Sequence, residues 1–189
     1  MKMHMQTGAT LAVKNMKGCL WRGSKVELHM LAKIEGIEEK SLNIPIGDMA
    51  SVLGPHLSLF DGTIGMEGLG PSAGRAKELG AVVVGVDPFA ADAVACELMG
   101  ISARDIPHLR MSAERGLGVI DLDRIAVSPE NWREATRPFA LPPENLSIEF
   151  AKVKVLDSQS CSACQANLLL FLRKHGEKHE QRNGIEQIG

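Results

Sequence analysis

The stretch that decides the fold is residues 59–101, LFDGTIGMEGLGPSAGRAKELGAVVVGVDPFAADAVACELMGI. Two apolar runs in it each end on an aspartate: Asp61 precedes a glycine-rich loop, and Asp87 precedes a helix that begins with proline. The β-branched run at 81–86 is typical of a strand that is buried on both faces. Ligands of open α/β folds gather at the carboxyl ends of strands, so we expect a site near these aspartates.

Strand-like and helix-like segments alternate on both sides of this stretch, which predicts an α/β fold with a mainly parallel or mixed sheet flanked by helices. We expect a single α/β domain over residues 1–175 and a polar, mobile tail over 176–189. The chain begins and ends within strand-like segments, so we interpret it as an incomplete copy of a larger fold. Strands are expected at residues 1–6, 56–60, 81–86, 119–127 and 148–156, and helices at 24–40, 45–53, 88–99, after Pro107 and at 161–175.

Composition excludes several classes of protein. With 189 residues and a net charge of −2, the chain has no basic field for nucleic acid or an anionic membrane surface. Its apolar runs are too short to span a bilayer, and four cysteines do not suggest a secreted disulfide scaffold. We therefore expect a cytoplasmic protein with reduced thiols and without nucleic-acid or membrane partners.

A glycine-rich loop is expected at residues 62–74, and four of its glycines follow the strand at 56–60 in the spacing GxxGxxGxG: Gly62, Gly65, Gly68 and Gly70. Glycines let backbone N–H groups approach an anion closely, although the spacing is neither GxGxxG nor a Walker motif. The alternative is a loop that needs positive φ at several positions, and we weigh the two interpretations about equally.

Acidic residues surround the same strand ends. Asp61, Glu67 and Asp87 are expected to face one crevice, where they would bind a hard cation or act in acid–base chemistry, although Asp87 is also a good helix N-cap. Asp92 lies in a helix that is apolar nearly all round, so it is expected to be buried and to need a partner. A structural hydrogen bond and a functional role explain Asp92 equally well.

Basic residues gather near the start of the chain. Lys2 and His4 share one face of the alternating segment 1–6, and Lys14, Asn15 and Lys17 follow soon after. Lysine and histidine together can bind an anion or move protons. A solvated strand face is the alternative.

The pair Cys161-Ser-Ala-Cys164 begins the last expected helix, where the helix dipole stabilises a thiolate. A CxxC is a redox pair or half of a zinc or iron–sulfur site. Packing explains the pair equally well, because both cysteines share a helical stripe with Leu168 and Leu172.

Read together, these segments resemble the uncharacterised family called domain of unknown function 362. The resemblance implies iron–sulfur association, because many members carry a ferredoxin-type cysteine module, whereas this chain has no CxxCxxCxxxC run. It also implies that the chain corresponds to the C-terminal part of such a protein. The residues that carry it are Lys2-x-His4, Thr10-Leu11-x-x-Lys14-Asn15-x-x-Gly18, Asp61-Gly62-x-x-Gly65-Met66-Glu67-Gly68-x-Gly70-Pro71, Gly85-x-Asp87-Pro88-x-x-x-Asp92-Ala93-Val94-Ala95, Met99-Gly100, Ala113-Glu114-x-Gly116-Leu117-Gly118 and Cys161-x-x-Cys164.

Three functions stay open. The first is a redox-associated protein whose Cys161 and Cys164 bind an iron–sulfur cluster or a divalent metal. The second is an enzyme or binder for a small anionic ligand, and the third is a non-catalytic subunit that completes a partner's sheet. The expected partners are a separately encoded N-terminal half, a ferredoxin-like protein or a second copy of the chain. In the second hypothesis the catalytic residues are Lys2, His4, Asp61 and Glu67, and the ligand-binding residues are Lys14, Asn15, Gly65, Gly68, Gly70 and Asp87.

Overall fold

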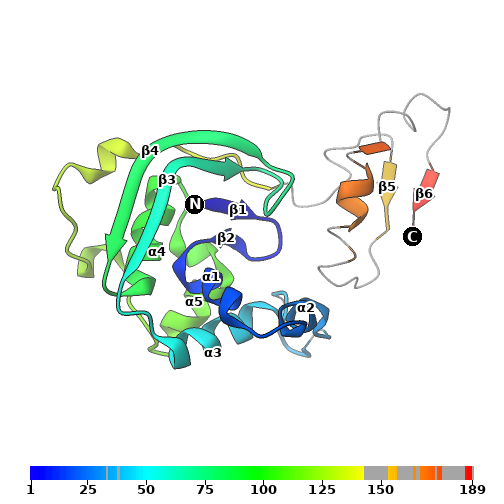
Figure 1. Ribbon diagram of the computed structural model, residues 1–189, viewed down its shortest axis with the longest axis horizontal. Helices are drawn as coiled ribbons and strands as arrows, with labels where there is room; N and C mark the ends of the chain where they lie inside the picture. Colours follow the sequence, from blue (N-terminus) through cyan, green and yellow to red (C-terminus); the bar gives the residue numbers. More distant parts are fainter. Residues whose placement is uncertain are drawn as a thin grey trace.

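The computed structural model describes residues 1–32, 34–37, 39–142, 153–156, 164, 167–172, 174–175 and 186–188. Its main sheet has four strands in the order β2-β1-β3-β4, in which β1 is parallel to β3 and the other neighbours are antiparallel. A mixed sheet flanked by helices confirms the predicted α/β class (Figure 1). The strands are β1 (Lys2–His4), β2 (Gly8–Thr10), β3 (Ser58–Glu67) and β4 (Arg75–Gly85).

Strands β3 and β4 form a long, curved antiparallel hairpin (Figure 1). The prediction of a glycine loop at 62–74 was wrong for its first half, because β3 continues through Gly62 and Gly65 to Glu67. A Cβ at Gly62 would lie 2.6 Å from the Ala81 carbonyl oxygen, and one at Gly65 would lie 2.6 Å from the Phe139 ring. These two glycines therefore serve close packing within a strand, which spacing alone does not distinguish from a loop.

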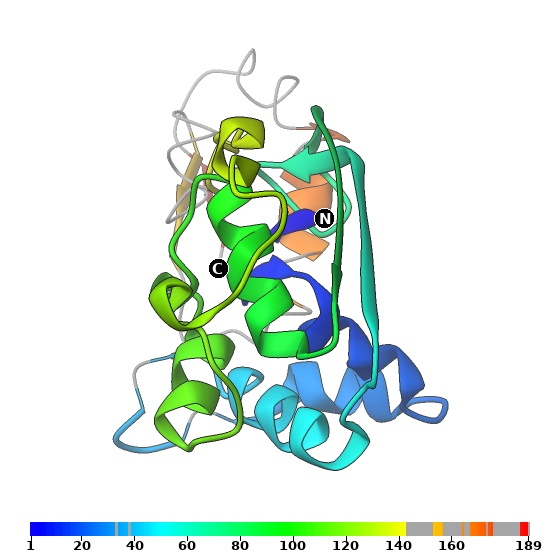
Figure 2. The same ribbon diagram turned by 90° about the vertical axis from the view of Figure 1, so that its left-hand side faces the viewer.

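Strand β4 has only one buried face. Val83 is 8% exposed, whereas Val82 and Val84 are 59% and 57% exposed. The prediction that residues 81–86 are buried on both faces was therefore wrong. In the described part of the chain, helix α4 (Pro88–Leu98) packs on β4 (Figure 2), and nothing comparable covers the outward-facing valines.

Local capping signals placed the helices well. The Asp87 carboxylate accepts hydrogen bonds from the backbone N–H groups of Phe89 and Ala90, at 2.8 and 3.1 Å, and so caps α4. Gly100, at φ +70°, follows its end in the left-handed region that favours glycine. Helices α3 (Asn43–Leu53) and α5 (Pro107–Glu114) likewise end just before Gly54 and Gly116.

The segment between β2 and α3 differs from its prediction. Among the described residues of 24–40, only two short turns are helical, α2 (Ser24–Glu27) and η2 (Leu28–Met30), and the apolar side chains of Val26 and Leu31 are 54% and 44% exposed. A long amphipathic helix is unstable without a surface that buries its apolar face. Residues 119–127 form no strand either, and contain the short helix η4 (Leu122–Arg124).

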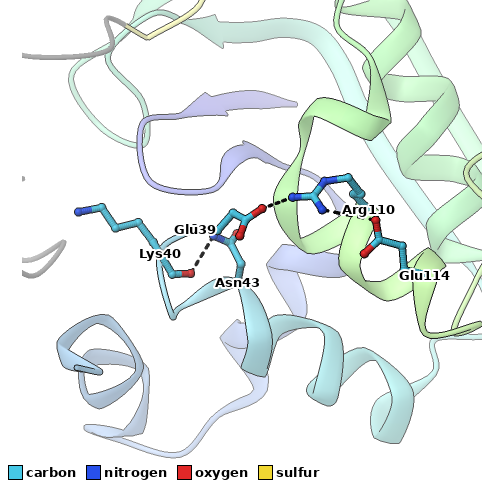
Figure 3. Close-up of polar contacts among 5 residues, drawn as sticks. All are labelled: Glu39, Lys40, Asn43, Arg110 and Glu114. Atoms are coloured by element: carbon cyan, nitrogen blue, oxygen red, sulfur yellow. Dashed lines mark hydrogen bonds and ion pairs between the residues drawn. The ribbon is translucent and has the colours of Figure 1, made fainter. Parts of the chain in front are cut away.

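A polar brace ties the end of this segment to α5 (Figure 3). Arg110 pairs with Glu39 and, at 3.4 Å, with Glu114 one turn along α5. The Asn43 amide donates a hydrogen bond of 3.0 Å to the Lys40 carbonyl oxygen at the start of α3. The brace thus fixes the entry to α3 beside α5.

Near the C-terminus, β5 (Val153–Val155) pairs in parallel with β6 (Glu186–Ile188) as a separate two-stranded sheet. Leu169 and Leu172 pack with Leu69 and Ala73 in a second apolar cluster. Much of the expected strand at 148–156, and most of the expected tail, lies outside the described residues. In the part of the chain that the structure describes, no helix has the length and apolar character needed to cross a membrane.

Candidate functional site

Two short helical turns after β2 carry the candidate site: α1 (Ala12–Asn15) and η1 (Met16–Cys19). The buried carboxylate of Asp92 holds the start of α1, accepting hydrogen bonds from Ala12 N at 2.8 Å and Val13 N at 3.1 Å. Burial raises the pKa of Asp92 to about 8, although both hydrogen bonds act in the opposite direction. Asp92 thus makes the structural hydrogen bonds that one of the two interpretations expected, and they supply the partners that a buried carboxyl group needs.

Five basic side chains from four elements meet beside α1, and we call them the basic cluster. Lys2 and His4 come from β1, Lys14 from α1, Lys17 from η1 and His29 from η2. The Lys17 ammonium contacts Nε2 of His29. His4 is 2% exposed, and its Nδ1 accepts a hydrogen bond of 3.1 Å from the Gln6 backbone N–H.

Burial, followed by nearby positive charges, lowers the pKa values of four of these groups. Burial, followed by Lys14, His29, Lys2 and Lys17, lowers the pKa of His4 to about 2. Burial and the neighbouring charges of Lys17 and Lys2 lower the pKa of Lys14 to about 8. The pKa of Lys17 is also about 8, because of burial and Lys25, and that of His29 is about 4, because of burial, Lys17 and Lys14.

No carboxylate compensates this charge among the described residues. The ion pairs found there use Arg75, Arg110, Arg115 and Arg133, and none uses a lysine of the basic cluster. The Lys2 ammonium donates to the Pro71 carbonyl oxygen at 3.2 Å. Like charges packed together without a counter-ion favour the binding of an anion.

His108 of α5 also lies within the influence of the Lys14 charge. It is 1% exposed, and neither ring nitrogen has a hydrogen-bond partner among the described residues. Burial, followed by the charge of Lys14, lowers the pKa of His108 to about 3. Sequence reasoning missed His29 and His108, because nothing in their local patterns distinguishes them from surface and core residues.

Four of the predicted site residues line one open groove of about 770 Å³, a volume typical of ligand pockets. They are Lys2, Asn15, Asp61 and Gly65. The remaining lining is mostly apolar; most of it comes from β3 and from residues 10–19, and Met1, Pro55, Leu57 and Ala76 complete it. The groove shares Lys2 with the basic cluster.

The expectation that Asp61, Glu67 and Asp87 face one crevice was wrong. Because β3 and β4 run antiparallel, Asp61 lies opposite Val82 within the hairpin, while Asp87 caps α4 and lines a second groove of about 940 Å³. The Glu67 carboxylate accepts a hydrogen bond of 3.0 Å from Ala140 N and pairs with Arg75 at 3.6 Å. Each carboxylate therefore has a separate local environment.

The last two predicted glycines have conformational and packing reasons for their positions. Gly68 turns at φ +72°, where β3 ends. A Cβ at Gly70 would lie only 1.8 Å from the Met3 carbonyl oxygen, so the chain there presses against β1. Neither glycine needs a ligand to explain it.

Of the two cysteines in the predicted metal site, the structure describes one. Cys161 lies outside the described residues, and Cys164 is helical and exposed. Within the described ranges, no three or more histidine, cysteine, aspartate or glutamate side chains are arranged to hold a metal ion. The assignment of Cys161 and Cys164 as metal ligands stays a prediction.

The basic cluster lies in the segment of the chain that matches a known protein family. The model of a family described as Domain of unknown function (DUF362) matches residues 1–97, which contain the whole basic cluster and Asp92. The thylakoid-associated protein sll1697 of Synechocystis sp. is 29% identical over 167 residues, which are 84% of this chain and 48% of that protein. The chain thus spans about half the length of this curated relative, and no solved structure matches it.

Proposed function

Because this chain belongs to the family of Domain of unknown function (DUF362) proteins, whose activity its description leaves open, we propose that it binds a small oxyanion at the basic cluster. The ligand carries a phosphate or carboxylate group. Lys2, Lys14 and Lys17 supply the charge, and His4 and His29 supply further hydrogen-bonding groups.

One observation supports this proposal above the others: the lysines of the cluster have no ion-pair partner in the described part of the chain. Burial and neighbouring positive charges lower the pKa values of Lys14 and Lys17 to about 8, so their charged forms are less favourable than those of a free lysine. A bound anion would relieve this repulsion and raise both pKa values. Binding is therefore coupled to proton uptake near pH 8.

We expect Lys14→Met to weaken the binding of inorganic phosphate at least about tenfold, since a charge-assisted hydrogen bond contributes roughly 1.5–3 kcal/mol. The measurement is isothermal titration calorimetry at low salt and pH 7. Lys77→Met is the control, because Lys77 lies on β4 with similar partial burial and does not contribute to the pKa shifts of the cluster. Equal affinities of the two variants, or no phosphate binding by the unaltered protein, would refute the proposal.

Redox or iron–sulfur association is a separate proposal that rests on the Cys161-Ser-Ala-Cys164 motif. Two thiolates are half of the usual ligand set of a zinc or iron–sulfur site, so the other ligands would come from a further segment or a partner. Iron and zinc analysis of anaerobically purified protein tests it. Metal that persists unchanged in the Cys161→Ser, Cys164→Ser double variant would contradict these ligands.

Location and partners are also proposals. A cytoplasmic location follows from the composition, whereas the name of the Synechocystis relative supports an association with thylakoids. Fractionation of source cells with an antibody to the chain distinguishes the two. A separately encoded N-terminal half or a ferredoxin-like protein would co-purify with the chain, and a second copy would appear as a dimer in sedimentation.

A further inference from the structure

We propose that the second groove accepts one extended segment of a partner protein, which pairs with the free edge of β4 and so adds a strand to the sheet. The groove, of about 940 Å³, is lined mainly by β4 from Ala81 to Asp87, by α4 and by residues between 124 and 135. It contains no residue of the basic cluster, so the inference does not depend on the anion proposal.

Strand β4 has an unpaired edge. It is the last strand in the order β2-β1-β3-β4, so β3 occupies one of its edges and the other borders the groove (Figure 1). Among the described residues, the backbone of Ala81 to Val86 makes no hydrogen bond except with β3. Alternate N–H and C=O groups along this edge are therefore open to a partner, and a further strand is what satisfies a whole row of them.

The far wall of the groove is also backbone with free hydrogen-bonding groups. Ile125 is extended, with φ −112° and ψ 119°, and residues 125–127 belong to no helix or strand. Residues 126–128 make no backbone hydrogen bond within the part of the chain that the structure describes. A groove with a wall on both sides takes a single extended segment, whereas the edge of a second sheet would collide with the far wall. This favours a partner's strand over a second copy of β4.

The side chains along the free edge are apolar on both faces of the sheet. Towards α4, the floor of the groove is formed by Ala90, Val94 and Leu98. On the opposite face, Val82 and Val84 are exposed. Successive side chains of a strand point to opposite faces, so the segment is expected to carry an apolar residue at every second position, facing α4. β-Branched residues suit its outward positions, beside the exposed valines. Such strand addition is a recurring mode of peptide recognition.

The probe is a capped peptide of the sequence Lys-Thr-Val-Thr-Val-Thr-Val-Thr-Lys, titrated into isotope-labelled protein and followed by NMR. We expect the amide signals of residues 81–87 and 125–128 to shift, those of the basic cluster to stay, and hydrogen exchange of alternate β4 amides to slow. N-methylation of all the valines removes the N–H donors along one edge of the peptide, and N-methylation of all the threonines removes those along the other. At least one of the two methylated peptides should bind at least about tenfold more weakly, because several hydrogen bonds are lost together.

A substitution in the floor of the groove tests the same site from the protein. Ala90→Phe places a ring where the segment would lie and leaves β4 unchanged, so peptide binding should weaken at least about tenfold. Ala76→Phe is the control, because Ala76 is exposed on β4 and lies outside this groove. Circular dichroism establishes that both variants are folded, and the methylated peptides decide the question if Ala90→Phe is not.

Three results would overturn the inference. One is that the unmodified peptide does not bind. Another is that it binds no better than either methylated peptide, because the groove is then an apolar pocket without strand pairing. The third is that the protein alone sediments as a dimer which Ala90→Phe dissociates, because a second copy then occupies the groove.

Discussion

Replacing Asp92 with alanine is expected to lower the free energy of unfolding by about 3 kcal/mol, since each buried donor left unsatisfied costs roughly 1–3 kcal/mol. The Asp92 side chain is fully buried and accepts the backbone N–H groups of Ala12 and Val13 at the start of α1. Alanine leaves both donors without a partner. Urea-induced unfolding monitored by circular dichroism measures the change.

Asp87→Ala is the matched control. Asp87 also accepts two backbone N–H groups, at 2.8 and 3.1 Å, but it caps α4 from a half-buried position. The loss there should be about 1 kcal/mol, as for an ordinary N-cap. If the two variants lose the same free energy of unfolding, burial does not strengthen the contribution of the Asp92 hydrogen bonds to stability.

Asp92→Ala should also weaken phosphate binding, because α1 carries Lys14 into the basic cluster.

The raised pKa of Asp92 also predicts how the stability of the protein changes with pH. Its pKa is raised to about 8 in the folded protein, so between pH ~4 and ~8 the folded state binds more protons than the unfolded state. This contribution to stability therefore falls as the pH rises through that window. Asp92→Asn, which cannot ionise, should flatten this part of the profile.

The second large effect is expected at Gly70, where alanine should destabilise the fold by about 3 kcal/mol, at the upper end of the range for overpacking. The new Cβ would lie 1.8 Å from the Met3 carbonyl oxygen and 2.7 Å from its carbonyl carbon, and both are backbone atoms of β1. The Gly70 carbonyl also accepts a hydrogen bond of 3.2 Å from Met5 N. Relief of the clash must therefore move β1 away from the turn.

Gly23→Ala is the control for this substitution. Gly23 has a negative φ of −70°, and a Cβ there would meet only Glu27 Oε1, at 3.9 Å. Its stability should be unchanged to within a few tenths of a kcal/mol. Because no ligand is needed for the Gly70 effect, thermal unfolding of the isolated protein suffices, and a Gly70→Ala protein as stable as Gly23→Ala would contradict the packing role.

The elements that sequence reasoning placed well are those with local chemical signals. The Asp87-Pro88 start of α4 and the glycines after α3, α4 and α5 act within a few residues, so their effect is readable from the chain. The β3–β4 hairpin was not predicted, because glycines in a strand look like glycines in a loop. The exposed valines of β4 and the broken segment 24–40 depend on which surfaces other elements cover, which a single sequence does not state.

In the candidate site, too, the residues with local sequence signals were predicted and those that depend on tertiary packing were not. The grouping of Lys2 with His4 came from strand alternation, and the addition of Lys14 came from its nearness in the chain. His29 and His108 reach the same environment only through tertiary packing. The three carboxylates were misplaced because their grouping depended on two parallel strands, and the strands are antiparallel.

The anion site is tested most directly by measuring the pKa of the Lys14 ammonium by NMR, with and without phosphate, using Lys14→Arg to assign its signal. We predict a pKa of about 8 in the free protein, and an increase towards the ordinary value when phosphate is saturating. A pKa near ~10.4 that phosphate does not change would contradict the claim that the basic cluster is an uncompensated site for an anion.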